Sequence, residues 1–200
     1  MARSTAEAAT RERILTAAVE VFARKGYHGA GVEDIVQASN TSKGAFYHYF
    51  PSKQGIFLTL MDDLAGLVEQ GVEAAIASEH GAMAKVEAAL RVVVETAAEQ
   101  RDLARILLVE AVGLGPEFEE KRLEIHSRFA RLIQRHLDRA VKEGSIPAQD
   151  TALVSAAWIG ALNEIISQWL VSGRKQLPAQ LPELRALLLR SIGAKAGSGR

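Results

Sequence analysis

TSKGAFYHYFPSK, at residues 41–53, carries a complete set of signals for one short helix. Ser42 is a favourable N-cap residue, because its hydroxyl can accept a hydrogen bond from a free backbone N–H of the first turn. Pro51 disfavours α geometry at Phe50 and so stops the helix. The sequence therefore predicts a helix of about two turns between Ser42 and Pro51.

The residues of this helix divide between two faces. With about 3.6 residues per turn, Phe46 and Phe50 share a face that can pack against the protein. The other face combines a cation, a bare backbone, a phenol and an imidazole, contributed by Lys43, Gly44, Tyr47 and His48. Groups of this kind contact phosphates and base edges in a major groove. An aromatic cluster with one lysine is common in protein cores, but the surrounding Ser-cap and Pro-stop signals favour a helix presented to DNA.

The preceding residues predict two more helices and a tight turn. Residues 10–25 place Ile14, Ala17, Ala18, Val21 and Phe22 at core-facing helical spacing, and Gly26 ends that helix. Residues 32–38 form a second short helix, and Asn40 can adopt the left-handed conformation that the turn at residues 39–41 requires. The sequence therefore predicts a helix-turn-helix unit, and a core this small is marginal without the rest of the chain.

These residues resemble the TetR/AcrR family of bacterial transcriptional regulators. The resemblance is carried by Gly26-Tyr27, Asp34-Ile35, the run from Ser42 to Phe50, and Ser52-Lys53. It implies an all-helical repressor that binds operator DNA as a dimer, with Tyr47 and Lys53 at phosphates and residues 42–48 at base edges. The expected DNA-binding residues are Thr41, Ser42, Lys43, Gly44, Ala45, Tyr47, His48, Tyr49 and Lys53. Gly31 departs from the family pattern, in which a Thr or Ser often caps the second helix, so one hydroxyl contact to a phosphate is expected to be missing.

The rest of the chain also predicts helices. Apolar residues recur at helical spacing over residues 52–77, 83–99, 102–114, 116–142, 151–172 and 181–192, and no β pattern is evident. We expect an all-α protein of about nine helices. Residues 1–51 would form the helix-turn-helix DNA-binding domain, residues 52–193 a ligand-binding and dimerisation domain, and residues 194–200 a flexible tail. Residues 1–8 are expected to be frayed.

Composition excludes several kinds of site. The chain has 24 Lys and Arg against 24 Asp and Glu, five His and no Cys. Disulfides and cysteine-based metal sites are therefore excluded, and no two His have the helical spacing of metal ligands. Residues 152–170 form the longest apolar segment, but polar residues interrupt it, so we expect no membrane span and a cytoplasmic protein. We find no catalytic constellation and expect neither an enzyme nor a cofactor.

The helix at residues 151–172 has more apolar circumference than one intrachain core requires. Ala156 and Gly160 place small residues four apart on it. We therefore predict that the last two helices pair with those of a second copy. The expected interface residues are Ala156, Gly160, Trp169, Leu184 and Leu188. A homodimer would place two recognition helices about 34 Å apart, which suits an inverted-repeat operator.

Polar residues within apolar helices point to a ligand. Glu110 and Asn163 interrupt strongly apolar runs, and a buried carboxylate needs a partner or a ligand. The expected effector-binding residues are Leu64, Arg105, Glu110, Arg122, His126, Phe129, Trp158 and Asn163. For Arg105, Arg122 and His126, pairing within the protein is an open alternative. The C-terminal half also resembles the fatty-acid-degradation regulators of the same family, through Leu103-Ala104, Glu110, Glu143-Gly144, residues 160–164 and Trp169, and this resemblance implies long-chain acyl-CoA as effector.

We thus expect a dimeric, ligand-responsive repressor with double-stranded operator DNA and a small hydrophobic effector as partners. Two alternatives stay open: a helical small-molecule binding protein that does not bind DNA, and an interaction protein that dimerises through its last two helices. Neither gives a role to the exposed set on the helix after Ser42.

Overall fold

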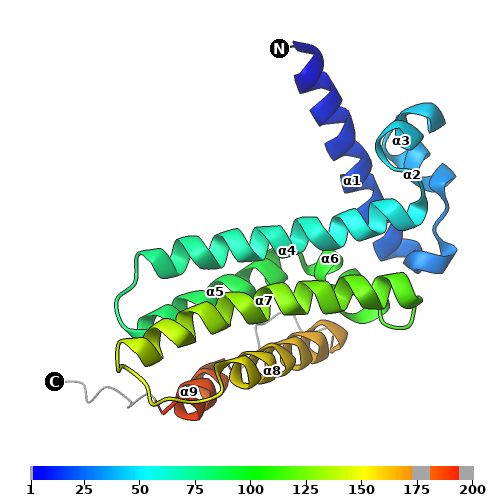
Figure 1. Cartoon of the computed structure of the whole chain (residues 1–200). Coiled ribbons are helices and arrows are strands. Elements are labelled where there is room, and N and C mark those ends of the chain that lie inside the picture. The colour runs from blue at the N-terminus through cyan, green and yellow to red at the C-terminus, as the bar shows by residue number, and fades with distance from the viewer. Residues whose placement is uncertain (1, 173–180, 194–200) are drawn as a thin grey trace. The chain divides into compact units, whose positions relative to one another are not determined.

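The computed structural model describes residues 2–172 and 181–193. In these residues the chain forms nine α-helices and one π-helical segment, η1, and contains no strand (Figure 1). The predicted all-α class is therefore confirmed. The elements are α1 (Ala2–Gly29), α2 (Val32–Ala38), α3 (Lys43–Tyr49), α4 (Lys53–Ala77), α5 (Ala82–Glu99), α6 (Arg101–Arg105), η1 (Ile106–Glu110), α7 (Pro116–Lys142), α8 (Thr151–Val171) and α9 (Leu181–Ser191). The tail predicted at residues 194–200 lies outside the described residues.

Most of these helices begin and end close to the predicted residues, but α1 begins earlier than predicted. It begins at Ala2, although residues 1–8 were expected to be frayed. At Gly26 the backbone leaves the helical region, with φ 68° and ψ 168°, and a short second helical segment follows as far as Gly29. The positive φ of Gly26 thus ends the long helix at the predicted position.

The single helix predicted over residues 102–114 was also wrong. The segment is α6 followed by η1, and the N–H of Ala111 donates to the carbonyl of Ile106 at 2.9 Å. That is a bond between residues five apart, which defines the wider π turn. Apolar periodicity is counted at the α-helical spacing and does not detect this change.

The chain divides into two compact units. Unit 1 contains residues up to Leu64 together with Asp102–Lys121, and unit 2 contains Ala65–Arg101 and the chain from Arg122 onward. Helices α4 and α7 each contribute residues to both units. The predicted domain boundary between residues 51 and 52 falls inside unit 1.

Unit 1 is built on an aromatic cluster. Phe22, Tyr27, Phe57 and Phe118 lie with ring centroids 5.1–5.9 Å apart, mostly edge to face. Phe22 and Phe57 are fully buried. Aromatic pairs in this arrangement add to the burial of their apolar area. The cluster joins α1 to the first turns of α4 and α7, and so completes the small core that the first three helices form.

Unit 2 has a core shared by α5, α7, α8 and α9. Its buried residues are Leu90, Leu137, Ile146, Trp158, Leu184, Leu188, Leu189 and Ile192. A smaller cluster of Val72, Ile76 and Leu132 joins the C-terminal part of α4 to α7. Helix α4 also approaches α5 closely, since a Cβ atom added at Gly71 would lie 2.9 Å from Cγ1 of Val92. No described helix is long and apolar enough to cross a bilayer.

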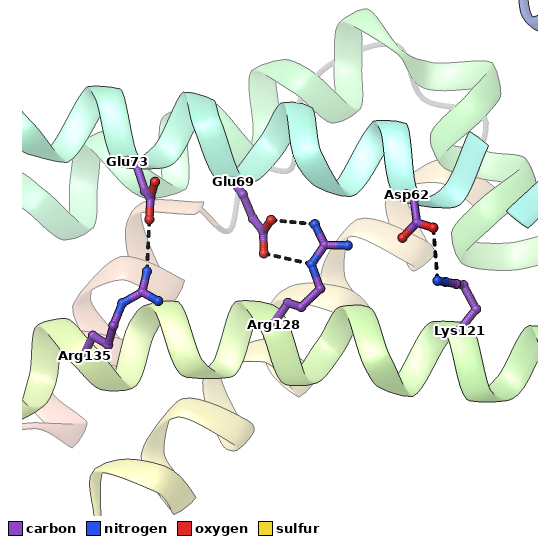
Figure 2. A network of polar contacts seen from close by, with 6 residues as sticks. All are labelled: Asp62, Glu69, Glu73, Lys121, Arg128 and Arg135. Atoms are coloured by element: carbon purple, nitrogen blue, oxygen red, sulfur yellow. Dashed lines mark hydrogen bonds and ion pairs between the residues drawn. The ribbon is translucent and has the colours of Figure 1, made fainter. Parts of the chain in front are cut away.

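Ion pairs connect α4 to α7 within each unit (Figure 2). The pairs are Asp62–Lys121 at 3.0 Å in unit 1, and Glu69–Arg128 at 2.6 Å and Glu73–Arg135 at 3.0 Å in unit 2. Arg128 donates through two nitrogens to both oxygens of Glu69, and each of these side chains is about three-quarters buried. The Arg135 and Glu73 side chains are more than half exposed. Only the Arg128 pair therefore has the geometry and burial that make an ion pair count for stability.

Candidate nucleic-acid interface

The turn between α2 and α3 has the predicted conformation. Asn40 has φ 49°, the left-handed value expected for it. The N–H of Thr41 donates to the carbonyl of Val36 at 3.2 Å, and the hydroxyls of Ser39 and Thr41 are 2.8 Å apart. This network of short-range bonds fixes the direction in which α3 leaves α2 (Figure 1).

Helix α3 is capped at the two predicted positions. Oγ of Ser42 accepts from the N–H of Ala45 at 3.0 Å, and Phe50 after the helix is extended, with φ −134° and ψ 116°. Phe46 and Phe50 are buried. They anchor one face of the helix, and the opposite face is left to solvent.

The exposed face of α3 carries four of the residues predicted to bind DNA. Lys43, Gly44, Tyr47 and His48 are all exposed, and Tyr47 retains 48% of its accessible surface. Ser42 is exposed as well, whereas Thr41, Ala45 and Tyr49 are half-buried. The structure thus brings the predicted recognition residues together on one short helix.

Among residues 2–172 and 181–193, no contact requires a glycine at position 44. Its φ is not in the left-handed region, and a Cβ atom added there would meet only Oγ of Ser42, at an ordinary 3.8 Å. Glycine in a helix costs up to about 1 kcal/mol relative to alanine. The bare backbone on this exposed face is therefore suited to close approach by another molecule.

Lys43 is paired with an acidic side chain from α2. Its Nζ lies 2.5 Å from Oε1 of Glu33, and both side chains are largely exposed. The hydrogen bond from Lys43 holds the pKa of the Glu33 carboxyl below its usual value, and Glu33 in turn raises the pKa of the lysine. Sequence analysis did not single out Glu33, because the two residues are ten apart and on different helices.

Lys53 has a different environment from the phosphate contact predicted for it. Its Nζ donates to the carbonyls of Tyr27 at 2.7 Å and Ala30 at 2.8 Å, and lies 4.4 Å from the centre of the Tyr27 ring. Burial lowers the pKa of this lysine. Two of its three N–H donors are therefore used to hold the end of α1 against the start of α4.

The start of α2 lacks a hydroxyl cap, as predicted from Gly31. The carboxylate of Asp34 instead accepts from the N–H of Gly31 at 3.0 Å, and Lys25 pairs with Asp34 at 2.8 Å. The hydrogen bond from Lys25, followed by that from Gly31, lowers the pKa of Asp34. Helix α2 is thus capped from within the chain, but it offers no Thr or Ser hydroxyl to a phosphate.

The predicted effector residues are divided between the two units. Leu64, Arg105 and Glu110 belong to unit 1, and Arg122, His126, Phe129, Trp158 and Asn163 to unit 2. Arg105 and Glu110 pair with each other at 2.8 Å, the internal alternative that the sequence left open. Trp158 is buried and its indole N–H donates to Oγ of Ser191 at 3.0 Å, so it belongs to the core of unit 2. In the described part of the chain, no three His, Asp or Glu side chains gather as metal ligands would.

The predicted dimer residues have two different environments. Ala156 and Gly160 are exposed on α8, and a Cβ atom added at Gly160 would meet no atom within 4 Å. Trp169, Leu184 and Leu188 are buried within their own chain. Leu184 and Leu188 belong to the core of unit 2. Leu153, Val171 and Leu187 are the exposed large apolar residues of α8 and α9.

Comparison with known proteins places both parts of the chain in one family. Residues 14–60 match the family described as bacterial regulatory proteins, tetR family, and residues 79–187 match the tetracyclin repressor-like C-terminal domain. The chain is 25% identical over 164 residues to the fatty acid metabolism regulator protein of Bacillus subtilis, covering 82% of this chain and 84% of that protein. It is 24% identical over 192 residues to the uncharacterised helix-turn-helix transcriptional regulator YdgC of the same organism, covering 96% of each.

Solved structures share the fold. The fatty acid degradation regulator FadR from Bacillus halodurans superposes with a TM-score of 0.82 at 24% identity, over 90% of this chain and 94% of that one. FadR from Bacillus subtilis in complex with stearoyl-CoA gives a TM-score of 0.81 at 24% identity, over 90% and 98%.

Proposed function

The chain belongs to the tetR family of bacterial regulatory proteins and is a DNA-binding transcriptional regulator, and we propose that it is a dimeric repressor released from its operator by a hydrophobic small molecule. Membership in this family also means that it is not an enzyme. The proposal covers three points: the residues that contact DNA, the dimer, and the effector.

The free face of α3 supports the first point. Lys43, Tyr47 and His48 offer donors for phosphates and base edges, and Gly44 allows the helix backbone to approach the DNA closely. Lys53 is left out of this set, because its ammonium already serves two carbonyls. Contacts to phosphate should make the affinity fall as salt is raised.

The exposed face of α8 supports the dimer. Leu153, Ala156 and Gly160 follow one another at helical spacing on this face, and a Cβ atom added at Gly160 would meet no atom of the described residues within 4 Å. Small residues let two helices approach closely, and an exposed apolar side chain such as Leu153 gains from being covered. Leu187 and Val171 add to the apolar surface of α8 and α9 that a second copy can cover.

Two similarities support the effector: the relative named as a fatty acid metabolism regulator aligns with 82% of this chain, and the similar solved structure of FadR from Bacillus subtilis is a complex with stearoyl-CoA. We therefore propose a long-chain acyl-CoA. Such a ligand releases DNA only if it binds the released conformer more tightly than the DNA-bound one. A hundredfold fall in operator affinity needs a difference of about 2.7 kcal/mol.

The test begins with selection of bound duplexes from a random-sequence pool. Lys43→Ala and Tyr47→Ala serve as variants, and Arg91→Ala, which removes an exposed cation of unit 2, serves as the matched control. The wild type and the control should enrich one inverted repeat that neither variant retains. Failure of the wild type to enrich any sequence would refute the operator proposal.

The selected duplex then tests the effector. Stearoyl-CoA should release the protein from it, whereas equal concentrations of stearate and of coenzyme A should not. If stearoyl-CoA leaves the operator affinity unchanged while its binding to the protein is measured directly, the acyl-CoA proposal is wrong and the operator proposal stands.

A further inference from the structure

The surface formed by the first turns of α2 and α3 carries one ion pair, between Glu33 and Lys43. Lys43 is the only lysine or arginine of α3, so it is the one permanent cation that this helix can offer to a phosphate. A carboxylate 2.5 Å away neutralises it. The positive charge of Lys43, which α3 could use to bind a phosphate, is thus already balanced within the protein.

Stability does not explain this pair. Glu33 and Lys43 retain 72% and 58% of their side-chain surface, and ion pairs between side chains this exposed contribute little to folding. Glu33 accepts a hydrogen bond from its own backbone N–H, but the N–H of the N-cap residue Gly31 is bound by Asp34 and not by Glu33. An acid in the first turn favours the helix dipole, but Asp34 already supplies one there.

The pair has a direct consequence for DNA binding. Non-specific DNA offers a protein only phosphates, and Lys43 can reach one only by leaving Glu33. The carboxylate is then left unpaired beside a negatively charged backbone. Base edges in the major groove offer a different partner, since the N4 amino group of cytosine donates to carboxylates.

We propose that Glu33 determines sequence specificity. In the free protein it pairs with Lys43, and on the operator a cytosine amino group replaces the lysine as its partner. On any other sequence the unpaired carboxylate weakens binding, and on the operator Lys43 is freed for a phosphate or a guanine. This inference rests on the proposed contact of α3 with DNA and adds a residue of α2 to it.

The test compares wild type and Glu33→Gln on two duplexes of equal length, the selected operator and an unrelated sequence, between about 50 and about 200 mM salt, a range over which phosphate contacts dominate the change in affinity. Glutamine keeps the size of the side chain but carries no charge, so it holds Lys43 much less strongly than the carboxylate does. The variant should bind the unrelated duplex several-fold more tightly. Its slope of log affinity against log salt should be steeper by about 0.9 for each subunit, because one more phosphate is contacted. The ratio of operator to unrelated affinity should fall about tenfold, within the range of one lost base contact.

Two controls separate this mechanism from a general change of charge. Glu20→Gln also removes one exposed negative charge, from α1. It should leave unchanged the slope of log affinity against log salt and the ratio of operator to unrelated affinity. In a Lys43→Gln background, Glu33→Gln should no longer steepen the slope. If the wild type selects an operator but Glu33→Gln behaves like Glu20→Gln, this inference is wrong and the proposed operator contact is unaffected. A wild type that selects no operator would instead refute the proposed operator contact.

Discussion

Gly44→Ala should make the protein more stable and a poorer DNA binder. The new methyl group meets only Oγ of Ser42 at 3.8 Å, and the backbone of α3 is not in a conformation that requires glycine. Alanine in place of a helical glycine gains roughly 0.5–1 kcal/mol, with the lower value expected in the first turn. For a chain of this size, that gain corresponds to a rise in Tm of about 1–4 °C, with the lower end expected here.

The same methyl group projects from the exposed face of α3, which we propose contacts DNA. If the helix backbone lies against the groove wall, the methyl must displace it, and we expect operator affinity to fall at least tenfold, which is about 1.4 kcal/mol. Urea denaturation measures the first effect, and fluorescence anisotropy with a labelled operator measures the second.

Gly66→Ala on α4 is the matched control, because a Cβ atom there meets no described atom within 4 Å and so also fits without strain. It should stabilise the protein and leave operator affinity unchanged. The reasoning fails if Gly44→Ala binds the operator as tightly as Gly66→Ala does, since the bare backbone of α3 would then have no partner. A loss of stability in Gly44→Ala would show that the helix, not the DNA, needs the glycine.

Three further outcomes concern stability and are measured by urea denaturation. Gly71→Ala should destabilise the protein by about 1–3 kcal/mol, because its Cβ atom would lie 2.9 Å from Val92 in the packed contact of α4 with α5; an unchanged midpoint would contradict this packing. Arg128→Met should lower the free energy of unfolding by about 1–2 kcal/mol, since it leaves the largely buried Glu69 without its two hydrogen bonds. Arg135→Met should lower it by less than about 0.5 kcal/mol, because that pair is exposed. Equal losses in the two variants would refute the role of burial. Burial, followed by repulsion from Lys85, lowers the pKa of His136 below 6.5. The unfolded chain therefore binds a proton more readily than the folded one, and stability should fall as pH drops through 6.5. His136→Gln should lose less stability between neutral pH and pH 5.5 than the wild type, and an identical loss would show that His136 is not responsible.

The sequence predicted α3 closely because its signals are local. Ser42 caps the residues directly after it, Pro51 acts on the residue before it, and Phe46 and Phe50 are one turn apart. The exposed set of Lys43, Gly44 and Tyr47 followed from the same geometry. None of these inferences needed a contact from elsewhere in the chain.

Contacts with partners that are distant along the chain left no sign in the sequence. Lys53 matched a family pattern, but the carbonyls of Tyr27 and Ala30 that take up its ammonium are more than twenty residues away. Leu184 and Leu188 form an apolar stripe that suits an interface as well as a core, and only the packing of α9 decides between the two. Glu33 was overlooked because its partner lies across the turn. Patterns within one helix identify which face is apolar, but not what covers it.

The π turn at η1 changes how this chain should be aligned with others. A π turn holds one residue more than an α turn, and each residue of an α-helix advances by about 100°, so the end of η1 at Glu110 is rotated by about that angle from where an uninterrupted α-helix would place it. In the turn that follows, Ala111 is buried and Val112 is 59% exposed. A relative with a regular helix here would therefore correspond to this chain only through a one-residue gap. Aligned without that gap, its inward-facing positions would be matched to residues that face solvent in this protein.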